Sequence, residues 1–333
     1  MTKKNRSLKT IKTVGVLCSG GDSPGMNCAI RAVIRTALGQ GLAPYGIQKG
    51  YSGLLEGNIF KMNASSVGNI MQKGGTILQT SRCPEFFKAE IRKEAAHILR
   101  RKGIDSFVVI GGNGSYKGAM DLWREHHIPI IGLPGTIDND VSASEYSIGF
   151  DTAVQTAVEA VDKIRDTASS HERTFIVEVM GRHSPAIALS VGVCTGAENI
   201  VLNSGTPDFE QIGQDILKGI KRGKNSSIII VAEGKTPGSL AYSVRDKLKE
   251  KFKLNSHVCI LGHIQRGGNP TPSDRLIASQ MGFQAILCLK NGQFPYAIAV
   301  QNGKVVPVTL EESIKDKNSP DSLLINLART LSI

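Results

Sequence analysis

The sequence lacks the cysteine patterns that build metal sites or disulfide frameworks. Its six cysteines are scattered over 333 residues, with no C-x-x-C pair and no zinc-like cluster of Cys and His. Such isolated cysteines are typical of a reducing, cytoplasmic environment. Aromatic residues are also scarce, at 5%, and no basic patch is interleaved with them. This pattern argues against a nucleic-acid partner.

Long apolar runs are missing as well. No stretch approaches the roughly 20 residues that cross a bilayer, and the basic segment 1–13 is not followed by an apolar signal core. We therefore expect neither a membrane span nor a secretory signal.

The composition otherwise fits a globular protein of about two domains, because 41% of the 333 residues are hydrophobic. The chain has 40 basic and 29 acidic residues, a formal charge of +11. This excess favours anionic partners such as phosphates or phosphorylated metabolites, although solubility alone could explain it.

Short β-branched runs alternate with segments of helical periodicity. We predict strands at 13–19, 105–111, 128–133, 175–180 and 227–233, a further strand ending near 261, and helices at 26–39 and about 115–126. Alternating strands and helices indicate an α/β fold with mostly parallel sheets covered by helices on both faces.

The loops that follow these strands carry glycines together with charged side chains. Ligands of such sheets bind beyond the carboxyl ends of the strands. The loops in question are 20–25, 111–115, 134–140, 181–185, 233–236 and 262–268. Each residue also has an ordinary structural explanation, such as a cap or a solvated surface charge, so the prediction depends on their shared location.

Two of these loops favour phosphate binding. Segments 20–27 and 111–115 each join a strand to a helix through glycines, so that backbone N–H groups and a helix N-terminus face the ligand. No Walker A loop and no protein-kinase signature is present.

The segment Gly135–Asp140 places two carboxylates two positions apart. Beside bound phosphates, Asp138 could take a proton from a substrate hydroxyl, while Asp140 could orient it or hold magnesium through water. The structural alternative is an Asx-type turn with two solvated acids.

Seven stretches resemble those of the 6-phosphofructokinases, in family order over about residues 11–315. They are SGGDSPGMN (19–27), TSRCPEF (80–86), GGNGS (111–115), PGTIDND (134–140), SHER (170–173), EVMGR (178–182) and LGHIQRGG (261–268). On these motifs the chain is identified as a member of that family, of the bacterial ATP-dependent type.

The resemblance implies two Rossmann-like three-layer domains and a glycolytic reaction in which Mg-ATP phosphorylates the 1-hydroxyl of fructose 6-phosphate. The implied division is 1–149 plus 263–314 for nucleotide binding and 150–262 plus 315–333 for the sugar phosphate.

The implied site residues fall into five groups. Asp138 would be the base, with Thr136 beside it, and Arg82 and Arg182 would balance charge. The implied ATP contacts are Gly21, Arg82, Cys83, Gly112, Asn113, Gly114 and Ser115, with Asn113 at the position of the magnesium ligand. The implied sugar-phosphate contacts are Thr136, Asp138, Arg173, Met180, Gly181, Arg182, Glu233, His257, His263 and Arg266. The implied contacts with ADP or another nucleotide effector are Arg31, Arg35, Arg165, Glu198, Arg222 and Lys224.

In the family, the residue at Arg173 and an arginine at the position of His257 reach the sugar phosphate from a neighbouring subunit. The resemblance therefore implies a homo-oligomer, most often a tetramer. It also favours ATP over pyrophosphate as donor, because pyrophosphate-using members typically carry Asp and Lys where this chain has Gly114 and Gly135.

Four positions depart from the family pattern. Asn113 replaces a magnesium-binding aspartate, so that magnesium is bound more weakly or depends more on Asp138 and Asp140. His257 replaces an arginine and cannot make its bidentate contact. Ser184-Pro185 stands where a glycine is usual, which could reshape the sugar loop. Ala64 stands where an effector-binding arginine is expected, which predicts weakened activation by a nucleoside diphosphate.

These departures leave two alternatives open. One keeps the enzyme class but changes the substrate, to another ketose phosphate such as sedoheptulose 7-phosphate or to pyrophosphate as donor. The other is a catalytically weak paralogue that binds nucleotide and sugar phosphate as a regulatory subunit.

Overall fold

The structure is a computed structural model that describes residues 11–170, 173–315 and 322–331. The chain divides into two compact units. The larger unit is Met1–Thr136, Val141–Gly149 and Asn269–Lys317, and the smaller unit is Ile137–Asp140, Phe150–Gly268 and Asn318–Ile333. Residues 137–140 and 263–268 thus fall in the smaller unit, whereas the division implied by the resemblance assigned them to the larger one.

The larger unit is built on a seven-stranded sheet in the order β11-β10-β5-β4-β1-β2-β3. Its strands are β1 (Thr13–Ser19), β2 (Ala43–Ile47), β3 (Ile59–Lys61), β4 (Ser106–Gly111), β5 (Ile130–Pro134), β10 (Tyr296–Gln301) and β11 (Lys304–Thr309). The pairs β10–β11 and β2–β3 are antiparallel, and the other pairs are parallel.

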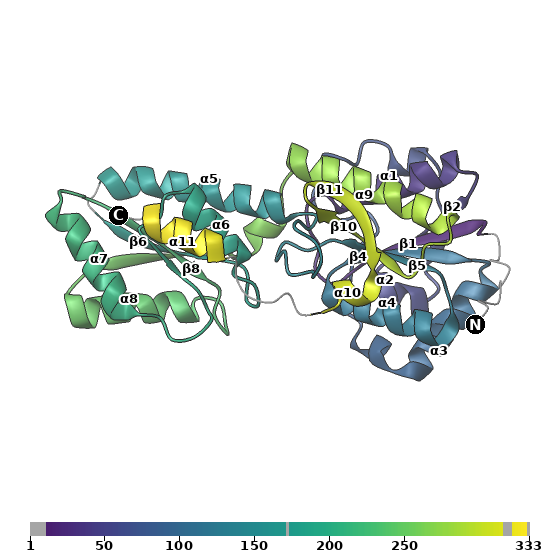
Figure 1. The fold of residues 1–333 in the computed structure, drawn as a ribbon, viewed down its shortest axis with the longest axis horizontal. Helices are drawn as coiled ribbons and strands as arrows, with labels where there is room; N and C mark the ends of the chain where they lie inside the picture. The colour runs from purple at the N-terminus through teal and green to yellow at the C-terminus, as the bar shows by residue number, and fades with distance from the viewer. Residues whose placement is uncertain (1–10, 171–172, 316–321, 332–333) are drawn as a thin grey trace. The chain divides into compact units, whose positions relative to one another are not determined.

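Helices cover both faces of this sheet (Figure 1). The helical elements of the larger unit are α1 (Met26–Gly39), α2 (Gly50–Leu55), η1 (Ser65–Val67), η2 (Pro84–Phe87), α3 (Ala89–Arg101), α4 (Asn113–His126), α9 (Pro272–Lys290) and α10 (Leu310–Ser313). Alternate strand residues point to opposite faces. Val108 of β4 accordingly packs with α1 and α9, whereas its neighbour Val109 packs with α3 and α4.

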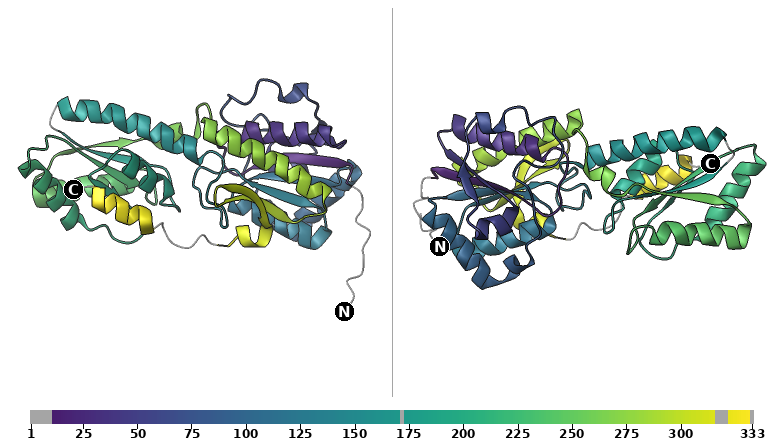
Figure 2. Two further views of the ribbon diagram at one scale, coloured as in Figure 1. Left: turned by 45° about the horizontal axis from the view of Figure 1, so that its top comes forward. Right: turned by 180° about the vertical axis from the view of Figure 1, so that it is seen from behind.

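The smaller unit contains a four-stranded, fully parallel sheet in the order β7-β8-β6-β9. Its elements are α5 (Phe150–Ser170), β6 (Thr174–Val179), α6 (Ala186–Cys194), β7 (Asn199–Val201), α7 (Phe209–Lys221), β8 (Ser227–Ala232), α8 (Ser239–Phe252), β9 (Ser256–Ile260), η3 (Gly262–Arg266) and α11 (Ser322–Leu331). One face packs against α5 and α6 and the other against α7 and α8, while α11 lies beside α6 (Figures 1 and 2).

The predicted fold class is confirmed, because both sheets are mostly parallel and both are sandwiched between helices. The predicted strand 13–19 and helix 26–39 are observed with the same bounds, as β1 and α1. Every described helix is too short or too polar to cross a membrane.

Candidate active site

Three loops of the larger unit meet at the carboxyl ends of β1 and β4. Gly20 N donates to Ser81 O over 3.3 Å, and Thr80 Oγ1 donates to Gly20 O over 2.9 Å. The Ser115 hydroxyl donates to Ser19 O over 3.0 Å. These bonds join the segments 19–25, 80–83 and 111–115 into one glycine-rich surface. The structure therefore brings together the predicted ATP residues Gly21, Arg82, Cys83, Gly112, Asn113, Gly114 and Ser115 as neighbouring loops of one unit.

Close backbone approach explains why glycine is needed in the loop after β4. A Cβ at Gly111 would lie 2.5 Å from Ser19 O, which no side chain tolerates. Gly112 is the N-cap of α4, so the helix starts at Asn113, inside the glycine-rich motif. The first N–H groups of α4 have no partners within the helix, as in phosphate sites at helix N-termini.

Sequence reasoning missed a set of buried residues that supports these loops. Tyr51 OH donates to Ser115 O over 2.7 Å, and its ring stacks on Phe86 with 3.8 Å between ring centroids. Arg92, only 5% exposed, donates to Phe86 O over 3.0 Å and forms an ion pair with Glu125. A buried arginine with several bonds fixes the turn that follows Arg82 and Cys83. No local pattern in the sequence links these distant positions.

The segment Gly135–Asp140 leads out of β5 without regular structure. Asn139 has a left-handed backbone, with φ of 48°, so that the flanking carboxylates of Asp138 and Asp140 belong to a tight turn. Burial raises the pKa of Asp138, the neighbouring Asp140 charge raises it further, and Arg266 partly offsets both effects. A carboxyl group with a raised pKa is suited to accept a proton near neutral pH.

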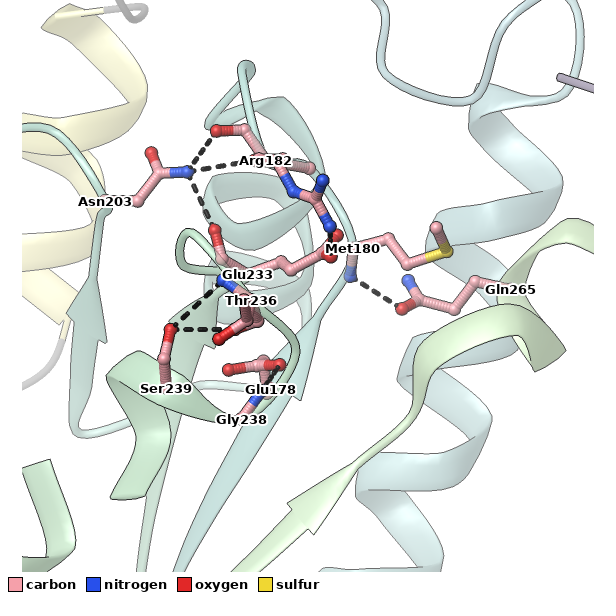
Figure 3. Close-up of polar contacts among 10 residues, drawn as sticks. Glu178, Met180, Arg182, Asn203, Glu233, Thr236, Gly238, Ser239 and Gln265 are labelled. Atoms are coloured by element: carbon pink, nitrogen blue, oxygen red, sulfur yellow. Dashed lines mark hydrogen bonds and ion pairs between the residues drawn. The ribbon is translucent and has the colours of Figure 1, made fainter. Parts of the chain in front are cut away.

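The carboxyl ends of β6 and β8 carry the predicted sugar-phosphate residues of the smaller unit. Glu233 N donates to Val179 O over 2.9 Å, and Met180 N donates to Oε1 of the buried Gln265 over 2.8 Å. Arg182 Nη2 lies 2.6 Å from Glu233 Oε1 in an ion pair (Figure 3). Met180, Gly181, Arg182, Glu233 and the η3 turn with His263 and Arg266 therefore surround one strand end.

Arg173 and His257 lie at the other end of the same sheet. Arg173 directly precedes β6, and His257 pairs in register with Phe175 at the start of that strand. Both side chains are exposed. The six residues of β6 separate them from Met180, roughly 20 Å along the strand. The structure thus does not bring these two residues to the pocket of their own chain. His171 and Glu172 of the SHER stretch lie outside the described residues.

The unusual Pro185 fits the backbone at the start of α6. It is the N-cap of α6 with φ of −80°, close to the value that the proline ring imposes. Its carbonyl accepts the first helical bond, from Leu189 N at 3.0 Å, and no N–H is required of it there. The turn itself is set by Gly181, whose φ of 122° excludes other residues.

The predicted effector residues fall into two groups. Glu198 pairs with Lys224 at 2.9 Å and with Arg165 at 3.6 Å, and Glu198, Lys224 and Arg222 line a cavity of about 1110 Å³ in the smaller unit. Arg31 and Arg35 instead belong to the larger unit, where they lie on α1. Ala64, the N-cap of η1, belongs to the larger unit as well. The structure thus joins only the four residues of the smaller unit.

The donors available for magnesium fit an ion that arrives with phosphates. Among the described residues, no three His, Cys, Asp or Glu side chains are arranged to hold a metal by themselves. Mg²⁺ in phosphoryl-transfer sites typically takes only one or two protein oxygens and completes its shell with phosphates and water. The amide oxygen of Asn113, beside the phosphate loops, is a ligand of that kind.

Comparison with known proteins agrees with this geometry. A family model described as phosphofructokinase matches residues 13–289. The chain belongs to the phosphofructokinase family. Curated phosphofructokinases that resemble it include the "ATP-dependent 6-phosphofructokinase" proteins of Thermoanaerobacter sp. and Thermotoga petrophila, each 48% identical over 97% of this chain and 100% of the relative. The protein of that name from Staphylococcus epidermidis is 46% identical over the same shares.

Solved phosphofructokinase structures share the fold. The Saccharomyces cerevisiae phosphofructokinase superposes with a TM-score of 0.83 at 35% identity, covering 97% of this chain and 48% of the yeast chain. The Pichia pastoris phosphofructokinase in the T-state gives 0.83 at 32% identity, covering 92% of this chain and 36% of that chain. This chain therefore spans less than half of either yeast protein. A pyrophosphate-dependent phosphofructokinase from Marinobacter aquaeolei, at 19% identity, shares the fold with a TM-score of 0.82, over 96% of this chain and 91% of that chain.

Proposed function

We propose that this protein is an ATP-dependent 6-phosphofructokinase, which transfers the γ-phosphoryl group of ATP to the 1-hydroxyl of fructose 6-phosphate and yields fructose 1,6-bisphosphate. The observation that carries the proposal is Asp138, a partly buried carboxyl group whose pKa is raised. Arg266 and the Arg182–Glu233 ion pair belong to the same unit. Relatives 46–48% identical over 97% of the chain bear the name of that activity. The reaction belongs to glycolysis, and we accordingly propose a cytoplasmic location.

In this mechanism, Asp138 accepts the proton of the 1-hydroxyl as the oxygen attacks the γ-phosphorus. Arg82 and Arg182 neutralise charge on the transferring group, and Thr136 lies two positions before the base. The loops 19–25, 80–83 and 111–115 hold the phosphates of ATP through backbone N–H groups. Met180, Gly181, Arg182, Glu233, His263 and Arg266 bind the sugar phosphate.

The glycines at two positions support ATP rather than pyrophosphate as the donor. A Cβ on Gly135 would lie 2.8 Å from Ile110 Cγ2 and 3.0 Å from Met26 Cε, so a lysine there would force these side chains to move. At Gly114, by contrast, a Cβ would meet nothing within 4 Å. The space beside Gly114 is available for the remainder of a nucleotide.

Magnesium would enter with ATP as part of the substrate. Its chemistry is to neutralise the phosphate charge as the bond to the leaving group breaks. Asn113 would offer it an amide oxygen, and the carboxylates of Asp138 and Asp140 could contribute further. The amide brings no charge, so the protein relies on its arginines for neutralisation.

We also propose a homotetramer in which Arg173 and His257 act on the sugar phosphate of a neighbouring chain. Both side chains are exposed at the sheet end far from their own pocket, which supports this arrangement. ADP or another nucleotide would bind at the cavity lined by Glu198, Arg222 and Lys224, beside Arg165, which pairs with Glu198. We expect weakened activation because Ala64 stands where the family has an effector-binding arginine.

The test is a coupled assay with fructose 6-phosphate and Mg-ATP on the wild type and on Asp138→Asn. We expect wild-type turnover and a loss of about 10³-fold or more in kcat for the variant, since it removes both a general base and its charge. Asp246→Asn, an exposed carboxylate on α8, controls for loss of charge and should retain full activity.

The Asn113→Asp variant separates the alternatives. A wild type that is silent with ATP and with pyrophosphate, but active once Asn113 becomes aspartate, would overturn the enzyme proposal in favour of a regulatory subunit. A wild type that prefers sedoheptulose 7-phosphate would correct the substrate but not the reaction class.

A further inference from the structure

One asparagine of the smaller unit connects the two loops that carry Arg182 and Glu233. Asn203 follows β7, and its side-chain Nδ2 lies 2.5 Å from Arg182 O, 2.9 Å from Glu233 O and 3.3 Å from Gly181 O. Figure 3 shows the Asn203 amide facing these loops from the side of β7. A single side chain thus donates to the backbone of two segments that are about fifty residues apart in sequence.

The three carbonyl groups belong to backbone that has left the sheet. Gly181 and Arg182 follow β6, and Glu233 follows β8, so their carbonyls receive no hydrogen bonds from the strand ladder. The turn after Gly181 is closed only weakly by Ser184 N, at 3.4 Å from Gly181 O. The amide of Asn203 therefore supplies much of what holds the Gly181–Arg182 turn against the Glu233 loop.

The side chains carried by these two loops depend on that connection. Arg182 Nη2 and Glu233 Oε1 are 2.6 Å apart, with the Arg182 side chain 46% exposed and the Glu233 side chain 11% exposed. A partly exposed ion pair gains little by itself and needs its backbone held in place to keep one geometry. The backbone of both partners is the part that Asn203 contacts.

We propose that Asn203 is a positioning residue for the sugar-phosphate pocket, and that its amide sets the spacing between Arg182 and Glu233 by hydrogen-bonding the backbone of both. The proposal rests on the proposed function, which assigns Arg182 and Glu233 to that pocket. Asn203 itself would not touch the sugar phosphate. An amide suits the task because the three groups that it faces are all acceptors, and its NH₂ group offers two hydrogens to donate to them.

The experiment compares Asn203→Leu and Asn203→Asp with the wild type. Leucine keeps the approximate size of the side chain but removes the donor, and aspartate places carboxylate oxygens against carbonyl oxygens. Asn225→Leu, an exposed asparagine in the turn before β8, is the matched control. Steady-state kinetics give KM for each substrate and kcat, and hydrogen exchange reports on the peptides that span 180–184 and 233–238.

For Asn203→Leu we expect a KM for fructose 6-phosphate raised about tenfold, the effect of losing one to two hydrogen bonds, with a lower kcat. The KM for Mg-ATP should stay at the wild-type value, because the phosphate loops lie in the other unit. Asn203→Asp should be affected more strongly. Hydrogen exchange of both peptides should be faster than in Asn225→Leu.

The kinetic and hydrogen-exchange results distinguish a failure of this inference from a failure of the proposed function. Equal changes in KM for both substrates, or a loss of stability alone, would mean that Asn203 is merely structural and would overturn the inference. If the wild type does not turn over fructose 6-phosphate, the proposed function fails, and exchange still decides the positioning role. Exchange rates of both loops that match those of Asn225→Leu would then refute it.

Discussion

Asp138 and Asp140 are neighbouring carboxyl groups, and the charge of Asp140 affects the pKa of Asp138. Burial is the first cause of the raised pKa of Asp138, and the charge of Asp140 is the second. In the proposed mechanism Asp138 is the base, and a base acts only while it is deprotonated, so activity should be lost as the pH falls through this raised pKa. We therefore expect the pair to set the acidic limit of the proposed activity.

We expect Asp140→Asn to move the acidic limb of the kcat/KM profile for fructose 6-phosphate to lower pH. The substitution removes the like charge that disfavours ionisation of Asp138, while burial remains. The measurement is the pH–rate profile, with Asp246→Asn as the control whose limb stays in place. An acidic limb unmoved in Asp140→Asn would show that its charge does not act on the base.

The sequence predicts candidate reactive side chains but not the residues that hold them in place. Asp138, Arg182 and Glu233 were predicted because they stand in motifs at strand ends. Asn203 and Arg92 were not, since Asn203 bonds the carbonyls of Arg182 and Glu233 and Arg92 pairs with the distant Glu125. An isolated polar residue in a loop or on a helix carries no periodic signal, and its partners are known only once the chain is folded.

Secondary-structure elements were predicted best where burial leaves a clear pattern, a continuous apolar run in β1 and a one-sided apolar stripe in α1. β1 and α1 were found with their predicted bounds. β5 starts at Ile130 rather than at Ile128, because Pro129 has no N–H to join the ladder, although its carbonyl accepts from Phe107 N at 3.0 Å. α4 starts two residues earlier than predicted, because Tyr116 N donates to Gly112 O over 3.1 Å and so includes Asn113 and Gly114 in the first turn.

The N-terminus of α8 is capped by a residue of another element. Gly238, at its N-cap, has no side chain, and Gly238 N donates to Glu178 Oε1 over 2.6 Å from β6 (Figure 3). Glu178 is 2% exposed, and its Oε2 has no hydrogen-bond partner among the described residues. Burial raises the pKa of Glu178, only partly opposed by the bond from Gly238.

This burial predicts the sign of a pH effect on stability. Because the folded-state pKa of Glu178 lies above its unfolded value of 4.5, the native state binds more protons in that window, and the free energy of unfolding falls as pH rises through it. Glu178→Gln stays neutral and keeps an acceptor. Its stability relative to the wild type should therefore increase as pH rises from about 4.5 towards neutrality.

Urea denaturation at a series of pH values measures this difference. Glu250→Gln is the opposing control, because Lys247 lowers the pKa of the exposed Glu250 through a hydrogen bond, so that variant should lose stability relative to the wild type as pH rises. A Glu178→Gln difference that is flat with pH would indicate that Glu178 ionises as easily in the folded as in the unfolded chain.

In the proposed assembly of several chains, Arg173 and His257 would contact the sugar phosphate of a neighbouring chain. They stand at the start of β6 and β9, while Arg182 follows the end of β6, so a distance of roughly 20 Å separates Arg173 from the pocket of its own chain. An arginine side chain does not span it. A sugar phosphate contacted by both Arg173 and Arg182 therefore requires two chains, which is the arrangement that the family resemblance implies.

Mixed oligomers test that requirement directly. Chains with Asp138→Asn and chains with Arg173→Ala should each be nearly inactive, but subunit exchange between them should restore activity. In a symmetric pair with reciprocal sites, one site receives both substitutions and the other receives neither, so about a quarter of all sites recover after random exchange. The coupled assay with fructose 6-phosphate and Mg-ATP follows this recovery.

The matched control mixes Asp138→Asn with Arg182→Ala, whose residues belong to the same unit of the same chain. Every site then keeps one of the two substitutions whichever chains associate, and no recovery is expected. If the Arg173→Ala mixture likewise remains at the average of its parents, although subunit exchange has been verified, then Arg173 does not act across a subunit boundary. Recovery in the first mixture alone assigns Arg173 to the pocket of a neighbour, because no arrangement within one chain can separate the two substitutions.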